Sequence, residues 1–135
     1  MLRGMDDPGQ LVGTMPFAVQ VGIEIDAASA EEVVGRMAWA PERCTAGGVL
    51  HGGALMSLAD SLGGVCAFLN LPPGAGTATI SSSTNMMRAV REGEVIATSR
   101  PLHVGRSVIV VQTELRDGEG RLVGQVTQAQ AVLGP

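Results

Sequence analysis

The stretch from Ala54 to Leu69 most constrains what this 135-residue chain can fold into. Its apolar residues recur at helical spacing and leave almost no polar face, so the sequence predicts a helix that other parts of the chain enclose. The stretch is 16 residues long with Asp60 at its middle, whereas a membrane-spanning helix needs about 20 apolar residues. We therefore expect a helix inside a globular domain, and no membrane segment.

Strand signals precede this helix. Residues Val19 to Asp26 alternate apolar and polar side chains, which predicts a half-buried strand, and Val33 to Trp39 fits its hairpin partner. Asp7 followed by Pro8 is typical of a helix start, so a short helix is expected over about residues 8–14, ending before Pro16.

Strand signals also follow the helix, after Pro72-Pro73-Gly74. Four antiparallel strands joined by short turns, a meander, are predicted over residues 76–87, 95–102, 108–115 and 122–132. The chain should thus form an α+β fold, an antiparallel sheet wrapped around one long central helix. We expect one domain over residues 1–135, with residues 1–15 as an N-terminal helical extension. Val108 to Val111 is apolar on both strand faces, which predicts that a second subunit covers the outer face and that the protein is at least a dimer.

Composition excludes several classes of function. The net charge is −4 and aromatic residues make up 2% of the chain, so neither the basic surface nor the stacking platform of a nucleic-acid-binding protein is present. The chain has two His, and Cys44 and Cys66 lack the spacing of a metal or redox motif, so no metal site is expected. The acidic start has no signal-peptide pattern, which predicts a cytoplasmic protein.

Charge is unevenly distributed along the chain. Residues 1–75 carry three Arg against eight acidic residues, and residues 76–135 carry six Arg against five. The second half is therefore where an anionic ligand would bind.

Asp60 is the residue least expected where it stands. An aspartate inside a helix is less favourable than alanine by up to about 0.7 kcal/mol, and this one is surrounded by apolar residues. One interpretation places it on a solvated stripe of the helix with Ser57 and Ser61. The other is a functional carboxylate in a pocket at a subunit boundary, which we favour because an unpaired buried carboxylate is costly.

His51-Gly52-Gly53 stands where the loop becomes the helix. The first backbone N–H groups of a helix have no intrahelical acceptor and attract anions. The Gly52 N–H is accordingly a candidate oxyanion donor, although a pair of glycines can simply form a tight turn. His51 and Asp60 are nine residues apart, about 13 Å along a helix, which is too far for direct contact within one chain.

A polar residue in the loop, a His-Gly-Gly sequence at the helix start and an acidic residue within the helix together form a motif. In this motif the chain resembles the PaaI-like branch of the hotdog-fold acyl-CoA thioesterases, which includes 4-hydroxybenzoyl-CoA thioesterase-like proteins. The motif stands here as Thr45-x5-His51-Gly52-Gly53-x6-Asp60, and the resemblance extends from about Phe17 to Leu133. It implies a thioester hydrolase that needs no metal or redox cofactor, since coenzyme A is part of the substrate. It also implies a homodimer with shared active sites that pairs further into a dimer of dimers, a homotetramer.

The resemblance also implies roles for individual residues. Asp60 would be the general base or the nucleophile, the Gly52 N–H the oxyanion donor, and His51 would position the loop and the carbonyl. Thr79 would orient the acid or the water. The substrate-binding residues would be Thr45, Gly53, Met56, Arg88, Gly105, Arg106 and Ser107. Of these, Met56 belongs to the acyl pocket, and Arg88 with the Gly105-Arg106-Ser107 turn would hold the coenzyme A phosphates.

Two departures from the family pattern leave an alternative open. Thr45 stands where the family commonly has Asn or Gln, and Ala89 stands where it commonly has Pro. A shortened donor at Thr45 favours a catalytically weak acyl-CoA-binding hotdog module as the second hypothesis. A dehydratase or hydratase of acyl thioesters fits the motif spacing less well, and a serine hydrolase is excluded because no GxSxG occurs.

Overall fold

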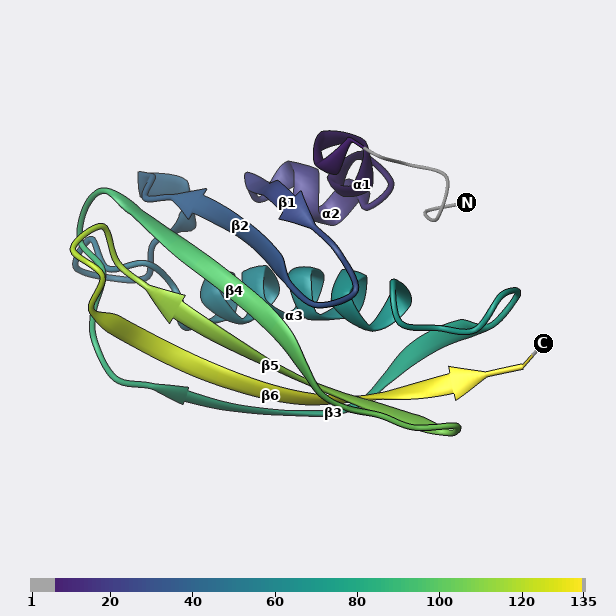
Figure 1. Cartoon of the computed structure of the whole chain (residues 1–135). Helices are drawn as coiled ribbons and strands as arrows, with labels where there is room; N and C mark the ends of the chain where they lie inside the picture. Colours follow the sequence, from purple (N-terminus) through teal and green to yellow (C-terminus); the bar gives the residue numbers. More distant parts are fainter. Residues whose placement is uncertain (1–6, 135) are drawn as a thin grey trace.

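A computed structural model describes residues 7–134 of the chain, and a single long helix, α3 (Gly52–Phe68), organises it. The helix lies against the concave side of a strongly bent sheet of six strands (Figure 1). The other elements in chain order are α1 (Pro8–Gly13), α2 (Pro16–Gln20), β1 (Ile23–Ala28), β2 (Val33–Ala38), the 3₁₀ helix η2 (Pro41–Arg43), β3 (Gly76–Met86), β4 (Glu94–Val104), β5 (Val108–Arg116) and β6 (Leu122–Leu133). The predicted α+β architecture is confirmed.

The sheet is antiparallel throughout, in the order β1-β2-β4-β5-β6-β3. Only β4, β5 and β6 follow one another as a meander, so the prediction of a four-stranded meander is wrong for β3. This strand pairs with β6 instead and forms one edge of the sheet. The reason is the length of the β3–β4 connection: residues 87–93 cross the end of the sheet and bond to Leu50 and Val123 on the way, which a tight hairpin could not do.

The N-terminal segment also differs from the expectation. Helix α1 is capped by the Asp7 carboxylate, which accepts a hydrogen bond from the Gly9 N–H at 2.9 Å. Pro16 does not end the helical region but begins α2, since proline fits the first position of a helix. Val19 and Gln20 therefore belong to a helix, and the first strand begins only at Ile23. The part of the proposed extension over residues 1–6 lies outside the described residues.

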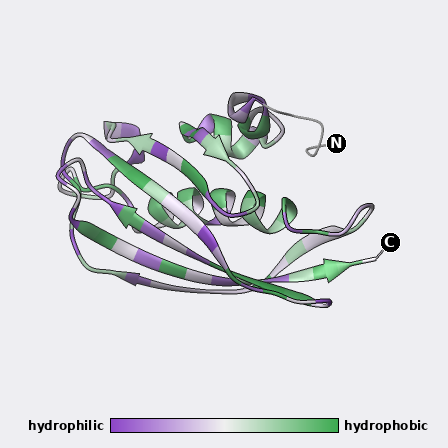
Figure 2. Cartoon of the chain, in the orientation of Figure 1, coloured by the Kyte–Doolittle hydropathy of each residue, from purple (hydrophilic) through white to green (hydrophobic). Residues whose placement is uncertain are grey.

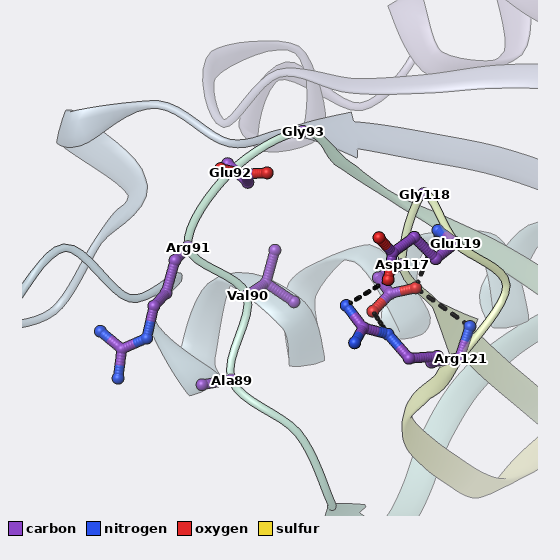
Figure 3. Close-up of a pocket in the computed structure, with 9 residues that line it drawn as sticks. All are labelled: Ala89, Val90, Arg91, Glu92, Gly93, Asp117, Gly118, Glu119 and Arg121. Carbon is purple, nitrogen blue, oxygen red and sulfur yellow. Dashed lines mark hydrogen bonds and ion pairs between the residues drawn. The ribbon is translucent and has the colours of Figure 1, made fainter.

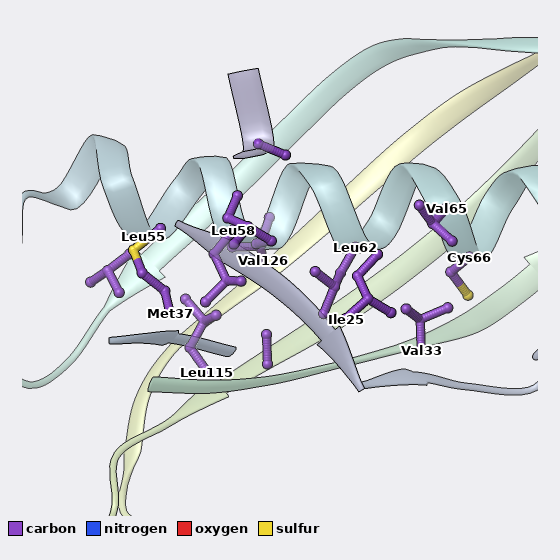
Figure 4. Close-up of a cluster of buried hydrophobic side chains, with 14 of the residues drawn as sticks. Ile25, Val33, Met37, Leu55, Leu58, Leu62, Val65, Cys66, Leu115 and Val126 are labelled. Atoms are coloured by element: carbon purple, nitrogen blue, oxygen red, sulfur yellow. The ribbon is translucent and has the colours of Figure 1, made fainter. Parts of the chain in front are cut away.

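The core lies between α3 and the sheet (Figure 4), and hydrophobic residues recur along the helix and the central strands (Figure 2). Leu58 and Leu62 of α3 are fully buried, as are Met37 of β2 and Leu115 of β5. Helix and sheet pack closely at Gly35, where a Cβ would overlap the Glu24 carbonyl and meet Leu62 at about 3.0 Å. Within residues 7–134, no helix combines the length and the apolar character needed to cross a membrane.

Candidate active site

The loop before α3 holds the first group of predicted site residues. An isolated bridge joins Cys44 to Leu50, and the Thr45 N–H donates to the Val49 carbonyl at 2.8 Å, which closes the loop on itself. His51 follows as the N-cap of α3, and its Nδ1 accepts a hydrogen bond from the Gly53 N–H at 2.8 Å. Because Nδ1 is an acceptor, the neutral ring carries its proton on Nε2.

Gly52 is the first residue of α3, and its N–H has no acceptor among the described residues. The space around it is open, since a Cβ at position 52 would meet nothing within 4 Å. A free N–H at the positive end of a helix, with no side chain in front of it, is a suitable donor to an oxyanion.

A cavity of about 400 Å³ lies beside this N–H, between the loop and the end of β3. It brings Thr45, Gly52 and Arg88 together, as the sequence predicts for residues that bind one substrate. The rest of its wall is largely apolar and comprises Val49, Leu50, Leu55, Met86, Met87, Ala89 and Val90. This cavity can accept an apolar or extended group next to the free N–H.

Asp60 lies on an exposed stripe of α3, and Gln128 of β6 reaches it from the sheet. The residues at four-residue spacing, Gly52, Met56 and Asp60, are all exposed in the single chain, so the helix is not enclosed all round as expected. Met56 is 45% exposed and lines none of the four cavities found in residues 7–134. Ser57 and Ser61 are only half-buried and flank this stripe.

Asp60 also lines a second cavity, of about 340 Å³, and Thr79 lies in the same wall. The Thr79 hydroxyl accepts a hydrogen bond from Gln130 Nε2 at 2.8 Å, and Gln130 Oε1 in turn accepts one from the Thr77 hydroxyl at 3.1 Å. Thr79 therefore keeps its own proton free to donate into the cavity. The structure thus brings Asp60 and Thr79 to one cavity.

His51 and Gly53 line a third cavity, of about 330 Å³, on the loop side of the helix. The single chain thus separates the predicted catalytic residues into neighbouring cavities. Gly52 and Asp60 are eight residues apart on one helix, which corresponds to about 12 Å. One protomer alone does not bring the oxyanion donor and the acid to a single reacting carbon.

The predicted phosphate contacts are separated more widely. The Gly105-Arg106-Ser107 turn lies level with the start of β3, because Val108 and Ala78 both pair with Ala131. Arg88 follows the other end of β3, a strand of 11 residues that spans roughly 35 Å. Both guanidinium groups are nevertheless available: among the arginines of residues 7–134, only Arg88 and Arg106 have neither a hydrogen bond nor an ion pair from their side chains.

Sequence reasoning missed several residues of the Asp60 cavity. Met15, Phe17 and Ala18 line it from α2 and the residue before it, and Gln130 lines it from β6. The helix signal of Pro16 at a first helical position could have revealed α2. Gln128 and Gln130 alternate with alanines, so their spacing could have indicated two amides on one face of the sheet.

A fourth cavity, of about 340 Å³, lies between the β3–β4 connection and the β5–β6 turn (Figure 3). Three of its charged groups are paired with one another, because Arg121 contacts Asp117 and Glu119 at 2.8 Å each. The Arg91 side chain points away from it. It contains none of the predicted site residues.

Comparison with known proteins identifies the family. Residues 47–124 match the thioesterase superfamily. An esterase of Vibrio cholerae is 45% identical over 76 residues, which is 56% of this chain, and this match spans about half (51%) of that relative's length. The 1,4-dihydroxy-2-naphthoyl-CoA hydrolase of Escherichia coli is 36% identical over 64% of this chain and 63% of its own.

Solved structures agree with this match. A thioesterase from Haemophilus influenzae superposes with a TM-score of 0.87 at 28% identity, over 93% of this chain and 87% of that one. A thioesterase from Streptococcus pneumoniae, crystallised with coenzyme A, superposes with a TM-score of 0.81 at 25% identity, over 91% of this chain and 97% of that one. The chain belongs to the thioesterase superfamily of hydrolytic enzymes and has the hotdog fold, which confirms the resemblance seen in the sequence.

Proposed function

We propose that this protein hydrolyses acyl-CoA or aryl-CoA thioesters to the free acid and coenzyme A, with no cofactor beyond the coenzyme A of the substrate, in the cytoplasm. The observation that carries the proposal is the unpaired, unobstructed Gly52 N–H at the start of α3, beside an apolar cavity. The names of the E. coli hydrolase and of the coenzyme A complex from S. pneumoniae support the substrate class.

In the reaction, the oxygen of water bonds to the thioester carbon, the carbon–sulfur bond breaks, and the coenzyme A thiolate leaves and takes up a proton. The Gly52 N–H stabilises the oxyanion that forms on the carbonyl oxygen, a contribution of about 2.7–4 kcal/mol for one such donor. The Nε2–H of His51 can donate to the same carbonyl. Asp60 has two possible roles: as a general base it removes the proton from this water, and as a nucleophile it attacks the carbon first, expels the thiolate and forms a mixed anhydride, which water then hydrolyses to the free acid and the Asp60 carboxylate.

The proposal includes a homodimer whose subunits share each site. β3 is an edge strand that is exposed over most of its length, so its outer edge can pair with a second copy. A two-fold axis at β3 reverses the partner, so that the α3 start of one subunit approaches the Asp60 of the other. The same axis brings Arg88 of one subunit towards the turn between β4 and β5 of the other. The two separations within one chain, that of Gly52 from Asp60 and that of Arg88 from this turn, are thereby overcome.

A second contact between dimers would give a dimer of dimers. Val108 and Val110 lie on the outer face of β5, opposite the buried Ile109 and Val111, and are half-buried in the single chain. They provide an apolar surface that another dimer can cover.

The test is the release of free coenzyme A, followed with a thiol reagent on short-chain, long-chain, phenylacetyl and hydroxybenzoyl thioesters. The variant Asp60→Asn is expected to lose a hundredfold or more in kcat, the scale on which general acid–base groups act. Asp26→Asn is the matched control, because Asp26 is an exposed carboxylate whose partner is Arg36 on the sheet surface. A rate that survives Asp60→Asn would contradict the assigned site.

The second candidate is a catalytically weak acyl-CoA-binding module. The observation that favours it is the short side chain of Thr45 in the cavity beside Gly52, where a longer amide could reach a substrate oxygen. Binding of coenzyme A without turnover on any of the thioesters would establish this candidate in place of the enzyme.

A further inference from the structure

Gln128 is a buried amide that the fold does not need for its own stability. It lies on the inner face of β6 beneath α3 and is 1% exposed. Its Oε1 has no hydrogen-bond partner among the described residues. Burying an amide with an unsatisfied oxygen is unfavourable, and a residue selected for packing alone would be apolar here, like its neighbour Val126 on the same face.

The helix above Gln128 is adapted to this side chain. Gly63 lies in the interior of α3, where glycine is the least favourable residue after proline. A Cβ at position 63 would overlap the Oε1 and the amide carbon of Gln128, so any larger residue there would displace the amide from its present position. Both elements therefore depart from their local preferences at one point of contact.

That point lies one helical turn from Asp60. Residues three apart are neighbours on a helix surface, and Gln128 Nε2 donates a hydrogen bond to Asp60 Oδ1 at 3.5 Å. Hydrogen bonds to catalytic groups are often long in unliganded enzymes and shorten when substrate binds. With Oδ1 held from the sheet side, Oδ2 remains available to the cavity that Thr79 also lines.

We infer that Gln128 is a positioning residue for the reaction: its amide fixes the Asp60 carboxylate from below the helix, and Gly63 provides the space. This inference rests on the proposed thioesterase function. Gln128 does not touch the substrate, so its effect must pass through Asp60 and change kcat rather than KM.

The decisive variant is Gln128→Met, which keeps the length and volume of the side chain but removes the N–H donor. We expect kcat for coenzyme A release to fall by about tenfold, the scale of a lost hydrogen bond to a charged group. KM should stay within about twofold, and the melting temperature should not fall, because an unsatisfied polar atom is removed. Loss of rate without loss of stability is a result that a merely structural residue would not give.

The matched control is Thr113→Val. Thr113 is a fully buried polar residue of the adjacent strand β5 that hydrogen-bonds Ser99 at 2.6 Å. Its replacement should lower the melting temperature and leave kcat unchanged. Gly63→Ala tests the same contact from the helix and should lower kcat when Gln128 is present. In a Gln128→Ala background it should cause no further loss of kcat, because the shorter side chain no longer overlaps the added methyl group. If Gly63→Ala does not fold, Gln128→Met decides alone.

The outcomes separate this inference from the proposed function. If the wild type hydrolyses thioesters and depends on Asp60, a Gln128→Met variant with wild-type kcat overturns the positioning role alone. The role is also overturned if Gln128→Met raises KM at constant kcat, or if it lowers the melting temperature at constant kcat as Thr113→Val is expected to do. A wild type that releases no coenzyme A, or an Asp60→Asn variant with full activity, overturns the proposed function and this inference together.

Discussion

Thr45 is the residue with a short polar side chain beside the proposed oxyanion site. It lies in the wall of the cavity beside the Gly52 N–H, and its own N–H is used to close the loop. Its side chain is exposed and short, so the oxyanion has fewer side-chain donors here than a longer amide would provide. The activity of the chain should therefore respond to a longer side chain at this position.

We predict that Thr45→Gln raises kcat for coenzyme A release by about tenfold, because an amide N–H can add a second donor at the oxyanion. Ala46→Gln is the control, since Ala46 is an exposed neighbour in the same loop that lines none of the cavities. An unchanged or lower rate for Thr45→Gln would show that the hydroxyl already supplies what the site needs.

The two thiols matter for measuring this activity. Burial raises the pKa of the Cys66 thiol to about 11, and the residue is fully buried, so it stays protonated at neutral pH. Because the thiolate is the reactive form, Cys66 will not consume a thiol reagent in the folded protein. Cys44 is half-buried and its thiol donates to the Ala40 carbonyl at 3.3 Å, so it is the residue to replace if the background is high.

At the scale of single elements, the β5–β6 turn is stabilised by one carboxylate. Asp117 Oδ1 accepts hydrogen bonds from the backbone N–H groups of Glu119 and Arg121 at 3.0 Å each, and Oδ2 accepts one from the Arg121 guanidinium (Figure 3). Partial desolvation opposes ionisation, but these donors together outweigh it and hold the pKa of Asp117 below its ordinary value.

This lowered pKa gives a pH-dependent prediction. The ionised Asp117 stabilises the fold fully above the pKa of an unfolded aspartate, about 3.9, and the contribution is lost as the pH falls through the lower folded value. Asp117→Asn should therefore melt at a lower temperature than the wild type at pH 7, and the difference should shrink as the pH falls below about 4. Thermal unfolding of both proteins over this range checks it, with Glu119→Gln as control because the Glu119 carboxylate contacts the Arg121 side chain and not Asp117. A difference that does not vary with pH would contradict the role of the charge.

Elements were predicted well where local signals agree. The predicted bounds of α3, β2, β4, β5 and β6 differ from those of the structure by no more than about two residues. The failure at β1 has a clear cause: Val19 and Gln20 fit both a period-two pattern and a short helix, and proline at position 16 together with packing against β1 and α3 decides for the helix.

At the scale of the whole molecule, β3 is the element on which the proposed dimer depends. It is polar and exposed through Ser81, Ser82 and Ser83, and one of its two edges is unpaired in the described chain. An isolated edge strand of this length invites pairing with another chain unless charges or prolines block it. None of these three positions carries a charge.

We predict that Ser81→Lys combined with Ser83→Lys separates the proposed dimer and abolishes coenzyme A release, because like charges would meet across the proposed two-fold axis. Analytical ultracentrifugation should show a shift to the monomer mass. The control is Ala27→Lys on β1, the opposite edge of the sheet, which should leave mass and activity unchanged. An active protein that stays dimeric with both lysines would place the interface elsewhere.

The sequence alone determined the features that depend on local pattern: a buried helix from its apolar repeat, a helix start from His51-Gly52-Gly53, and an unusual acid at Asp60. Tertiary structure alone decided what depends on contacts between distant residues. It placed β3 beside β6, opened the outer stripe of α3, separated Arg88 from Arg106 along β3, and set Gln128 beneath Asp60. The physical reason is that the spacing of apolar residues indicates which side of its own element a residue faces. Strand order and the neighbour across the core are fixed by packing between distant segments, which no local pattern encodes.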